Sequence, residues 1–182
     1  MLTSEQLKDL TRLFPINPPF TMIDNPQNGF NGYLLRCKAP EQELGSDSLL
    51  IKGPDTDGWV HNRLNNDIEK RIDLRKVWWK KTGTNLYVNV NLDVDPSDWE
   101  RVDQLFFNEF TDEEILQLSQ YLNKIILNTY LPSFEPFAIV WHLKQLKVQE
   151  DGSIRERPVH AHFMYARKTG RITTAENKLI RR

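Results

Sequence analysis

At 182 residues, the chain is long enough for one domain with a substantial buried core. Its hydrophobic residues make up 39% and its charged residues 27%, which is typical of a globular protein and not of a disordered chain. The formal net charge of −1 favours neither a polyanionic nor a polycationic partner, so the distribution of charge matters more than its sum.

Cysteine usage and apolar content bear on the compartment. The single cysteine, Cys37, has no partner for an internal disulfide, which is typical of a reducing compartment. No apolar run approaches the roughly 20 residues that a membrane helix requires. The first residues, MLTSEQLKDL, lack the basic-then-apolar layout of a signal peptide. We therefore expect a cytoplasmic protein with no membrane partner.

The N-terminal part of the chain predicts a short helix followed by a loop. In residues 3–14 the leucines follow a helical spacing, and Thr3 and Gln6 stand at the positions of a capping box. Residues 15–32 are rich in Pro, Asn and Gly, which favours a loop.

Five segments follow before the histidine-rich region. Residues 33–39 are a candidate strand, residues 40–58 are turn-rich, and residues 60–81 predict a loop that leads into a helix. Residues 84–94 alternate apolar and polar side chains, which predicts a half-buried strand. Residues 111–132 predict the longest helix, because a capping box opens it and apolar residues then follow one helical face.

The C-terminal third predicts a hairpin. Residues 137–148 and 157–167 are candidate strands, and the Asp151-Gly152 pair between them is a turn signal. The element order predicts an α+β fold, with a mostly antiparallel sheet and helices packed on one face. We expect residues 1–30 to form an N-terminal appendage and residues 31–182 to form the main domain.

Three of the four histidines fall in this predicted hairpin. His160 and His162 are two residues apart in a strand, so they project from the same face. His142 on the preceding strand can lie beside them if the hairpin pairs about its turn. Three converging imidazoles can hold one divalent cation and leave coordination positions open. A His-x-His pair alone is more often two half-exposed polar residues, and the third histidine favours a metal site.

The same order of elements resembles the HUH endonucleases, which include plasmid relaxases and rolling-circle replication initiators. A strand, a long helix, a strand with one histidine and a strand with His-x-His are similar to residues 84–165 here. Within that superfamily, YLLRCK, VHNRLNNDI, TNLYVNV and WHLKQ…RPVHAHF resemble motifs of the Mob/Pre (MobV-type) mobilisation relaxases. The resemblance covers residues 33–168, and the polar residues in corresponding places are His61, Asn62, Asn65, Asp67 and Asn85.

The resemblance implies a two-layer palm of antiparallel sheet and helices, and it implies an activity. A relaxase nicks one DNA strand, stays attached to the 5′ phosphate and later rejoins the ends. His142, His160 and His162 would hold the metal, Mn²⁺ or Mg²⁺ with Zn²⁺ as an alternative. In MobV-type relaxases a histidine resembling His61 is the implicated nucleophile, and Tyr33 and Tyr87 are the fallback candidates.

Tyr165 is a less suitable nucleophile, because strand parity turns it away from His160 and His162.

The implied partner is single-stranded or hairpin DNA. Basic residues concentrate in 70–81 and 167–182 and acidic residues in 93–114, a distribution that could produce one basic and one acidic face. Trp78 and Trp79 could stack on unpaired bases. The basic residues expected to contact phosphates are Lys70, Arg71, Arg75, Lys76, Lys80, Lys81, Arg167, Lys168 and Arg171.

Departures from the relaxase pattern leave two other functions open. Lys144 and Gln145 stand where relaxases carry a carboxylate after the first histidine. One alternative is therefore a non-catalytic nucleic-acid-binding or assembly domain on the same scaffold. The other is an unrelated metalloenzyme with a three-histidine site. A cupin-like site is disfavoured, because HAHFMYARKTG has no glutamate after its doublet.

Overall fold

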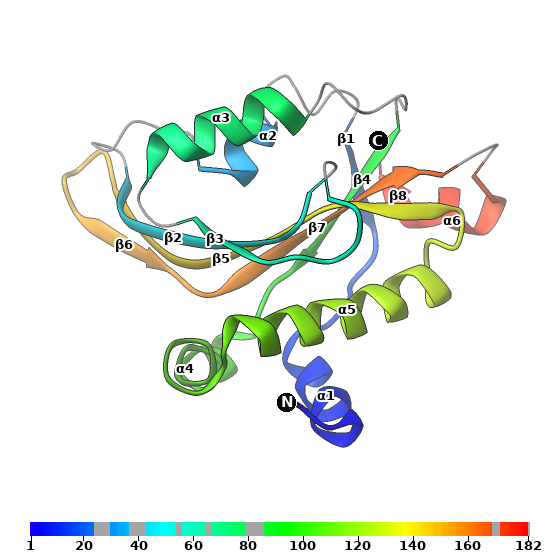
Figure 1. Ribbon diagram of the computed structural model, residues 1–182, viewed down its shortest axis with the longest axis horizontal. Coiled ribbons are helices and arrows are strands. Elements are labelled where there is room, and N and C mark those ends of the chain that lie inside the picture. Colours follow the sequence, from blue (N-terminus) through cyan, green and yellow to red (C-terminus); the bar gives the residue numbers. More distant parts are fainter. Residues whose placement is uncertain are drawn as a thin grey trace.

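In the computed structural model, the chain forms a mixed, open, eight-stranded sheet with helices on both faces (Figure 1). The structure describes residues 1–23, 30–36, 43–53, 56–64, 67–78, 86–168 and 172–181. The predicted α+β class is confirmed. The relaxase-like palm stays a prediction.

The strands lie in the order β3-β2-β5-β7-β4-β1-β8, and β6 pairs with the outer part of β5. The described pairs are antiparallel apart from β1 with β8, which is parallel, so the sheet is mixed and, as predicted, mostly antiparallel. The bounds are β1 Phe20–Ile23, β2 Glu43–Lys52, β3 Asn62–Leu64, β4 Tyr87–Leu92, β5 Phe134–Val148, β6 Ile154–Arg157, β7 His160–Arg167 and β8 Ile180–Arg181.

Helices cover both faces of the sheet, whereas the sequence predicted helices on one face. In Figure 1, α2 and α3 lie over one face, and α1, α4 and α5 lie under the other. Within the described residues, no helix combines the length and the apolar character needed to cross a bilayer. The bounds are α1 Ser4–Leu10, α2 Phe30–Leu34, α3 Ile68–Trp78, α4 Trp99–Gln104, α5 Asp112–Thr129 and α6 Thr174–Leu179, with short 3₁₀ or π turns at Thr11–Leu13, Pro96–Asp98 and Leu105–Glu109.

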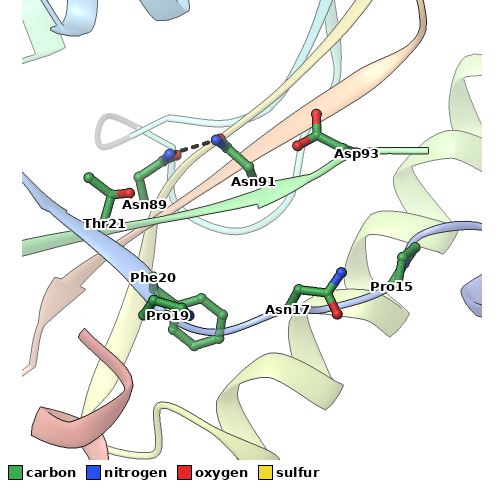
Figure 2. A pocket seen from close by; sticks show the side chains of 8 residues that line it. All are labelled: Pro15, Asn17, Pro19, Phe20, Thr21, Asn89, Asn91 and Asp93. Atoms are coloured by element: carbon green, nitrogen blue, oxygen red, sulfur yellow. Dashed lines mark hydrogen bonds between the residues drawn. The ribbon is translucent and has the colours of Figure 1, made fainter. Parts of the chain in front are cut away.

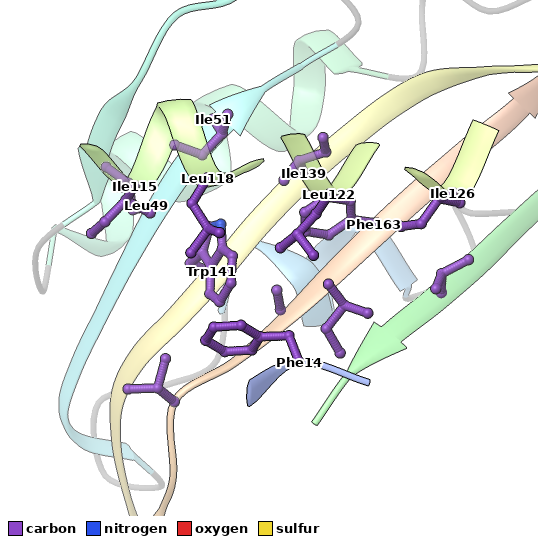
Figure 3. Close-up of a cluster of buried hydrophobic side chains, with 14 of the residues drawn as sticks. Phe14, Leu49, Ile51, Ile115, Leu118, Leu122, Ile126, Ile139, Trp141 and Phe163 are labelled. Atoms are coloured by element: carbon purple, nitrogen blue, oxygen red, sulfur yellow. The ribbon is translucent and has the colours of Figure 1, made fainter. Parts of the chain in front are cut away.

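The larger core lies between the sheet and α5 (Figure 3). Trp141 of β5 is fully buried there, and its ring lies 5.2 Å from that of Phe14 and 5.0 Å from that of Phe106, measured between centroids. Its indole Nε1 donates to Ser119 Oγ of α5 over 2.8 Å, which satisfies the polar atom of the ring. The predicted long helix is confirmed, with its capping box at Thr111 and Glu114.

A second, smaller core lies on the opposite face, under α2 and α3. Arg71 of α3 is 2% exposed and stabilises this layer by donating to backbone carbonyls, to Leu35 over 3.0 Å and also to Leu64. The carbonyls belong to the turn after α2 and to β3, so one guanidinium ties α3 to two neighbouring segments.

The N-terminal residues are part of the same fold. The predicted first helix is confirmed as α1, with its capping box at Thr3 and Gln6, and Leu7 and Leu10 are buried in the larger core. β1 adds a strand to the sheet beside β4. Residues 1–23 therefore pack with the rest of the chain.

The structure differs from two predictions in the middle of the chain. Of the strand predicted at 33–39, residues 33–34 belong to α2 and residues 37–39 lie outside the described part of the chain. Residues 43–52 form β2 where turns were predicted. Leu49, Leu50 and Ile51 of β2 are all buried, because cores lie on both faces of the sheet. A strand covered on both faces does not alternate, so periodicity does not reveal it.

The predicted hairpin is confirmed. β5 pairs with β6 from Gln145 to Val148 and with β7 from Phe134 to His142, so β6 and β7 run along the same edge of β5. The turn contains Gly152 with a φ of 82°, a conformation that favours glycine. The hairpin places its two histidine-bearing strands side by side in the middle of the sheet.

Candidate metal centre

The three histidines converge on the sheet face that α2 covers. His142 of β5 and His160 of β7 are directly paired across the two strands, and His162 lies one step further along β7 on the same face. One nitrogen from each ring can be chosen so that all three lie within 4.8 Å of one another. The prediction that these three side chains come together is confirmed.

The histidine cluster is buried and electrically neutral. His142, His160 and His162 are only 2–3% exposed. Burial lowers the pKa of all three imidazoles, and the nearby Arg36 guanidinium lowers each further. The pKa of His160 falls to about 4. Neutral imidazole is the form that binds a metal ion, so the cluster needs no deprotonation at neutral pH.

Backbone carbonyls determine which nitrogen of two rings carries the proton. His142 Nε2 lies 2.8 Å from the carbonyl oxygen of Leu34, and His160 Nδ1 lies 2.9 Å from that of Pro158. A carbonyl oxygen only accepts, so each of these nitrogens carries a hydrogen. His142 Nδ1 and His160 Nε2 are therefore left with lone pairs, 3.1 Å apart. Such a hydrogen bond on the outer nitrogen is the usual support for a metal-binding histidine.

Arg36 supplies the positive charge that these lone pairs face. Its Nη2 donates to His142 Nδ1 over 2.8 Å, and its side chain is 4% exposed. Arg36 follows α2 with a φ of 54°, an uncommon conformation for a residue with a Cβ. A metal ion on His142 Nδ1 would take the same lone pair, so Arg36 and a metal ion compete for it.

His162, the third histidine of the cluster, differs from the other two in its hydrogen bonding. Within the described part of the chain, neither of its nitrogens has a hydrogen-bond partner, although both are buried. Its ring packs edge-on against the rings of Phe30 and Tyr33 of α2, at centroid distances of 6.4 and 5.3 Å. An unsatisfied buried imidazole costs free energy, and binding a cation would satisfy it.

The donor set fits a transition metal. Three imidazole nitrogens suit Zn²⁺ and similar ions, whereas Mg²⁺ prefers carboxylate and carbonyl oxygens. Among the described residues, the three histidines form the group that could hold a metal ion, and it includes no carboxylate. The cluster therefore favours Zn²⁺ over the Mg²⁺ that the resemblance implies.

Of the predicted nucleophiles, Tyr33 is the one beside this cluster. Its ring lies 5.3 Å from that of His162 and 6.0 Å from that of His142, centroid to centroid. The Arg36 guanidinium lies 5.1 Å from the centre of the same ring. α2 and the following turn thus bring Tyr33 and Arg36 to the histidines.

His61 lies elsewhere. It precedes β3, and its Nε2 is 3.1 Å from a carboxylate oxygen of Glu113 on α5, the helix that covers the opposite face. The structure therefore does not bring His61 to the histidine cluster.

The other two tyrosines differ in the face they occupy. Tyr87 of β4 belongs to the smaller core on the cluster's face, where it packs against Phe137 with centroids 5.0 Å apart. On β7 it pairs with Ala166, which lies on the same face as His162 but four residues further along the strand. Tyr165 donates to Asn123 of α5 over 3.0 Å, which confirms that it points away from the cluster.

The predicted DNA-contacting residues separate into exposed and buried ones. Lys70 and Lys76 of α3 are exposed, as are Arg167 and Lys168 at the end of β7, and Arg75 is half-buried. Arg71 is the correction, because its guanidinium is buried and donates to the carbonyls described above. The predicted residues outside the described part of the chain are Lys80, Lys81, Arg171, Asn65, Asn85 and Trp79.

Comparison of the chain with protein-family models, with curated protein sequences and with solved structures gives no match. The geometry of the site is therefore the basis for any functional inference. Sequence reasoning missed Arg36 and the Leu34 carbonyl. Neither has a spacing signal, because 106 residues separate Arg36 from His142 and 108 separate Leu34 from it.

Proposed function

We propose that the protein is a metal-dependent enzyme that nicks and rejoins one DNA strand, with a covalent 5′-phosphate intermediate. The observation that carries the proposal is the contact of the Tyr33 ring with two of three converging, neutral imidazoles. A hydroxyl nucleophile next to a cation site is the arrangement that phosphoryl transfer requires.

In this proposal, His142, His160 and His162 hold a divalent cation through one nitrogen each. The bound ion supplies Lewis-acid stabilisation of negative charge on the non-bridging phosphate oxygens. Tyr33 Oη forms a bond to phosphorus, the bond from phosphorus to the 3′ oxygen breaks, and the hydroxyl proton of Tyr33 ends on that oxygen. Rejoining is the reverse reaction, so the phosphoester bond energy is retained in the protein–DNA link.

Charge on the same side of the molecule supports a nucleic-acid partner. Lys70 and Lys76 of α3 are exposed, and α3 lies over the sheet face that carries the histidines. Lysines at such positions attract a phosphate backbone in a salt-dependent way. DNA as the partner remains part of the proposal.

A trapping experiment tests the proposal. Protein would be incubated with a single-stranded oligonucleotide library and Zn²⁺, Mn²⁺ or Mg²⁺, and protein–DNA adducts would be resolved on denaturing gels. We expect an adduct with at least one metal, and none after chelation or with His160→Ala. Absence of adduct with every metal would overturn the proposal.

Two variants separate the nucleophile from the reaction. Tyr33→Phe should remove the adduct but leave Zn²⁺ binding intact, because the phenol oxygen is not a ligand in this assignment. His61→Ala should retain the adduct, since His61 is bonded to Glu113. Loss of the adduct in His61→Ala, with retention in Tyr33→Phe, would move the nucleophile to His61.

A non-catalytic domain on the same scaffold is the second candidate. It is favoured by the burial of the cluster, where His142, His160 and His162 are 2–3% exposed beneath α2. In that case the metal would stabilise the fold, and DNA would bind without an adduct. Zn²⁺ binding with DNA binding but no adduct is the result expected for it.

A further inference from the structure

A polar groove lies one strand away from the histidine cluster (Figure 2). It has a volume of about 210 Å³ and runs between the edge of β4 and the segment that leads into β1. The residues that line it are Pro15, Asn17, Pro19, Phe20, Thr21, Asn89, Asn91 and Asp93. The functional site described above uses none of them.

Strand alternation places the polar side of the groove on the same face as the histidines. Val88, Val90 and Leu92 of β4 point into the larger core, so the residues between them, and Asp93 after them, point the other way. Figure 2 shows Asn89, Asn91 and Asp93 projecting in a row. Asn91 is the direct cross-strand partner of His162 on β7. Directly paired residues on one face are close neighbours, so the groove borders the cluster.

The groove exists because the pairing of β4 with β1 ends early. Toward the start of β1, the pairing ends at Thr21 with Asn89. The chain before Thr21 contains Pro15 and Pro19. Proline has no N–H to donate to a neighbouring strand, so this segment cannot continue the ladder. The edge of β4 beyond Asn89 therefore stays open, with the exposed side chains of Asn91 and Asp93 beside it.

Hydrogen bonding fixes the polarity of this row. Asn89 Nδ2 donates to Asn91 Oδ1 over 2.8 Å. The amide nitrogen of Asn91 is then left as a donor toward the groove, next to the Asp93 carboxylate, which is an acceptor. Asn89 is 5% exposed, and its Oδ1 has no hydrogen-bond partner among the described residues. The lining thus offers a donor beside acceptors.

We propose that this groove binds a base whose Watson–Crick edge presents an amino donor beside a ring-nitrogen acceptor, adenine or cytosine, from the single strand whose phosphate lies at the histidine cluster. The inference rests on the proposed function and adds the part of the substrate that is recognised. Adenine and cytosine each present an amino donor beside a ring-nitrogen acceptor, which complements Asp93 and the Asn91 amide. Asparagine with adenine and aspartate with the cytosine amino group are established pairings.

A base fits this groove better than a phosphate does. The described residues that line it include no lysine or arginine, and the Asp93 carboxylate would repel a phosphate. The rings of Pro15 and Pro19 add apolar surface beside the polar row. Thymine has no amino group and presents a single N3–H between two carbonyl oxygens, which the Asp93 carboxylate repels.

Homopolymer binding tests the inference. Fluorescein-labelled dA12, dC12 and dT12 would be titrated with the full chain in low salt and a chelator, and the dissociation constants measured by fluorescence anisotropy. We expect dA12 or dC12 to bind roughly tenfold more tightly than dT12, as one good bidentate contact provides. In Asn91→Ala and Asp93→Ala this ratio should approach one.

Matched controls keep the outcomes distinct. Glu150→Ala removes one exposed carboxylate in the β5–β6 turn and should keep the wild-type ratio. Because Asp93 is exposed, Asp93→Ala should keep the wild-type melting temperature, whereas Asn91→Ala also removes the acceptor of the buried Asn89 amide and should lower it slightly. Equal binding of all three homopolymers, or a ratio unchanged in both variants, would overturn the base inference and leave the nicking proposal standing. Failure of every homopolymer to bind would also overturn the base inference, whereas the adduct experiment with metal decides the nicking proposal.

Discussion

His142 Nδ1 lies 3.1 Å from His160 Nε2, and the opposite nitrogen of each ring hydrogen-bonds a backbone carbonyl. With both protons on the outer nitrogens, the inner lone pairs face each other, which is unfavourable unless a cation lies near them. The Arg36 guanidinium supplies that charge to His142 in this structure. A divalent ion would supply it to both rings, and the predictions below follow from this relationship.

Removing one imidazole should weaken metal binding. We expect His160→Ala to weaken Zn²⁺ binding by at least tenfold, because it removes one of the three nitrogens that lie together. Isothermal titration of the chelator-treated protein measures this directly. His61→Ala is the matched control, since His61 bonds Glu113 and should leave the Zn²⁺ affinity unchanged. Equal loss in both variants would argue against the cluster as the binding site.

Removing Arg36 should strengthen metal binding. Arg36→Ala frees the His142 lone pair and removes a positive charge from the site, so we expect a Zn²⁺ dissociation constant lowered by about tenfold, or roughly 1.4 kcal/mol. Arg157→Ala is the control, because Arg157 acts on His160 and His162 through charge alone. Its effect should be smaller. Weaker Zn²⁺ binding in Arg36→Ala would show that Arg36 supports the site instead of competing for it.

The metal-free protein should lose stability as the pH falls below 6.5. Burial lowers the pKa of His160 from 6.5 to about 4, so the unfolded chain binds a proton in this range and the folded chain does not. Above pH 6.5, His160 costs the folded protein no stability. As the pH drops from 6.5 to about 4, the free energy of unfolding falls because of His160, by about 3 kcal/mol at most.

Urea unfolding between pH 7 and 4.5, with chelator present, measures this loss. The lowered pKa values of His142 and His162 act in the same direction. His160→Gln should show a shallower decrease than the wild-type protein. Parallel curves for the two proteins would contradict the assignment.

Arg71 should matter for stability, whereas Lys70 should matter for DNA. Arg71→Ala removes a buried guanidinium that donates to the Leu35 and Leu64 carbonyls, so we expect a loss of roughly 2–4 kcal/mol in unfolding free energy. Lys70→Ala, one position away on the exposed side of α3, should change stability by less than about 0.5 kcal/mol. In the proposed function, it should also weaken oligonucleotide binding. Chemical denaturation of the two variants distinguishes the roles.

Local signals predicted the parts of the fold that local interactions determine. The capping boxes of α1 and α5 were readable because each involves residues three positions apart. The hairpin was readable from Asp151-Gly152, and strand parity then placed His160 and His162 on one face. These elements bring the three histidines together without reference to the rest of the chain.

Distant contacts were not predictable in this way. α2 covers the cluster from more than 100 positions away in sequence, so no pattern within one window connects Arg36 to His142. The resemblance to relaxases implies His61 as a nucleophile, but pairing of β3 with β2 puts the start of β3 at the sheet's edge, where His61 meets Glu113 of α5. Short strands such as β1 and β8 depend on their partners and leave little trace in sequence.

The short segment from Phe30 to Arg36 contacts the cluster in three ways: the Tyr33 ring, the Leu34 carbonyl and the Arg36 guanidinium. Metal loading and the position of the tyrosine are therefore coupled through one piece of backbone. Coupling of this kind is reciprocal, so whatever shifts this segment alters metal affinity, and metal binding alters the segment by the same free energy. A ligand that moves Tyr33 could be detected by its effect on Zn²⁺ affinity alone.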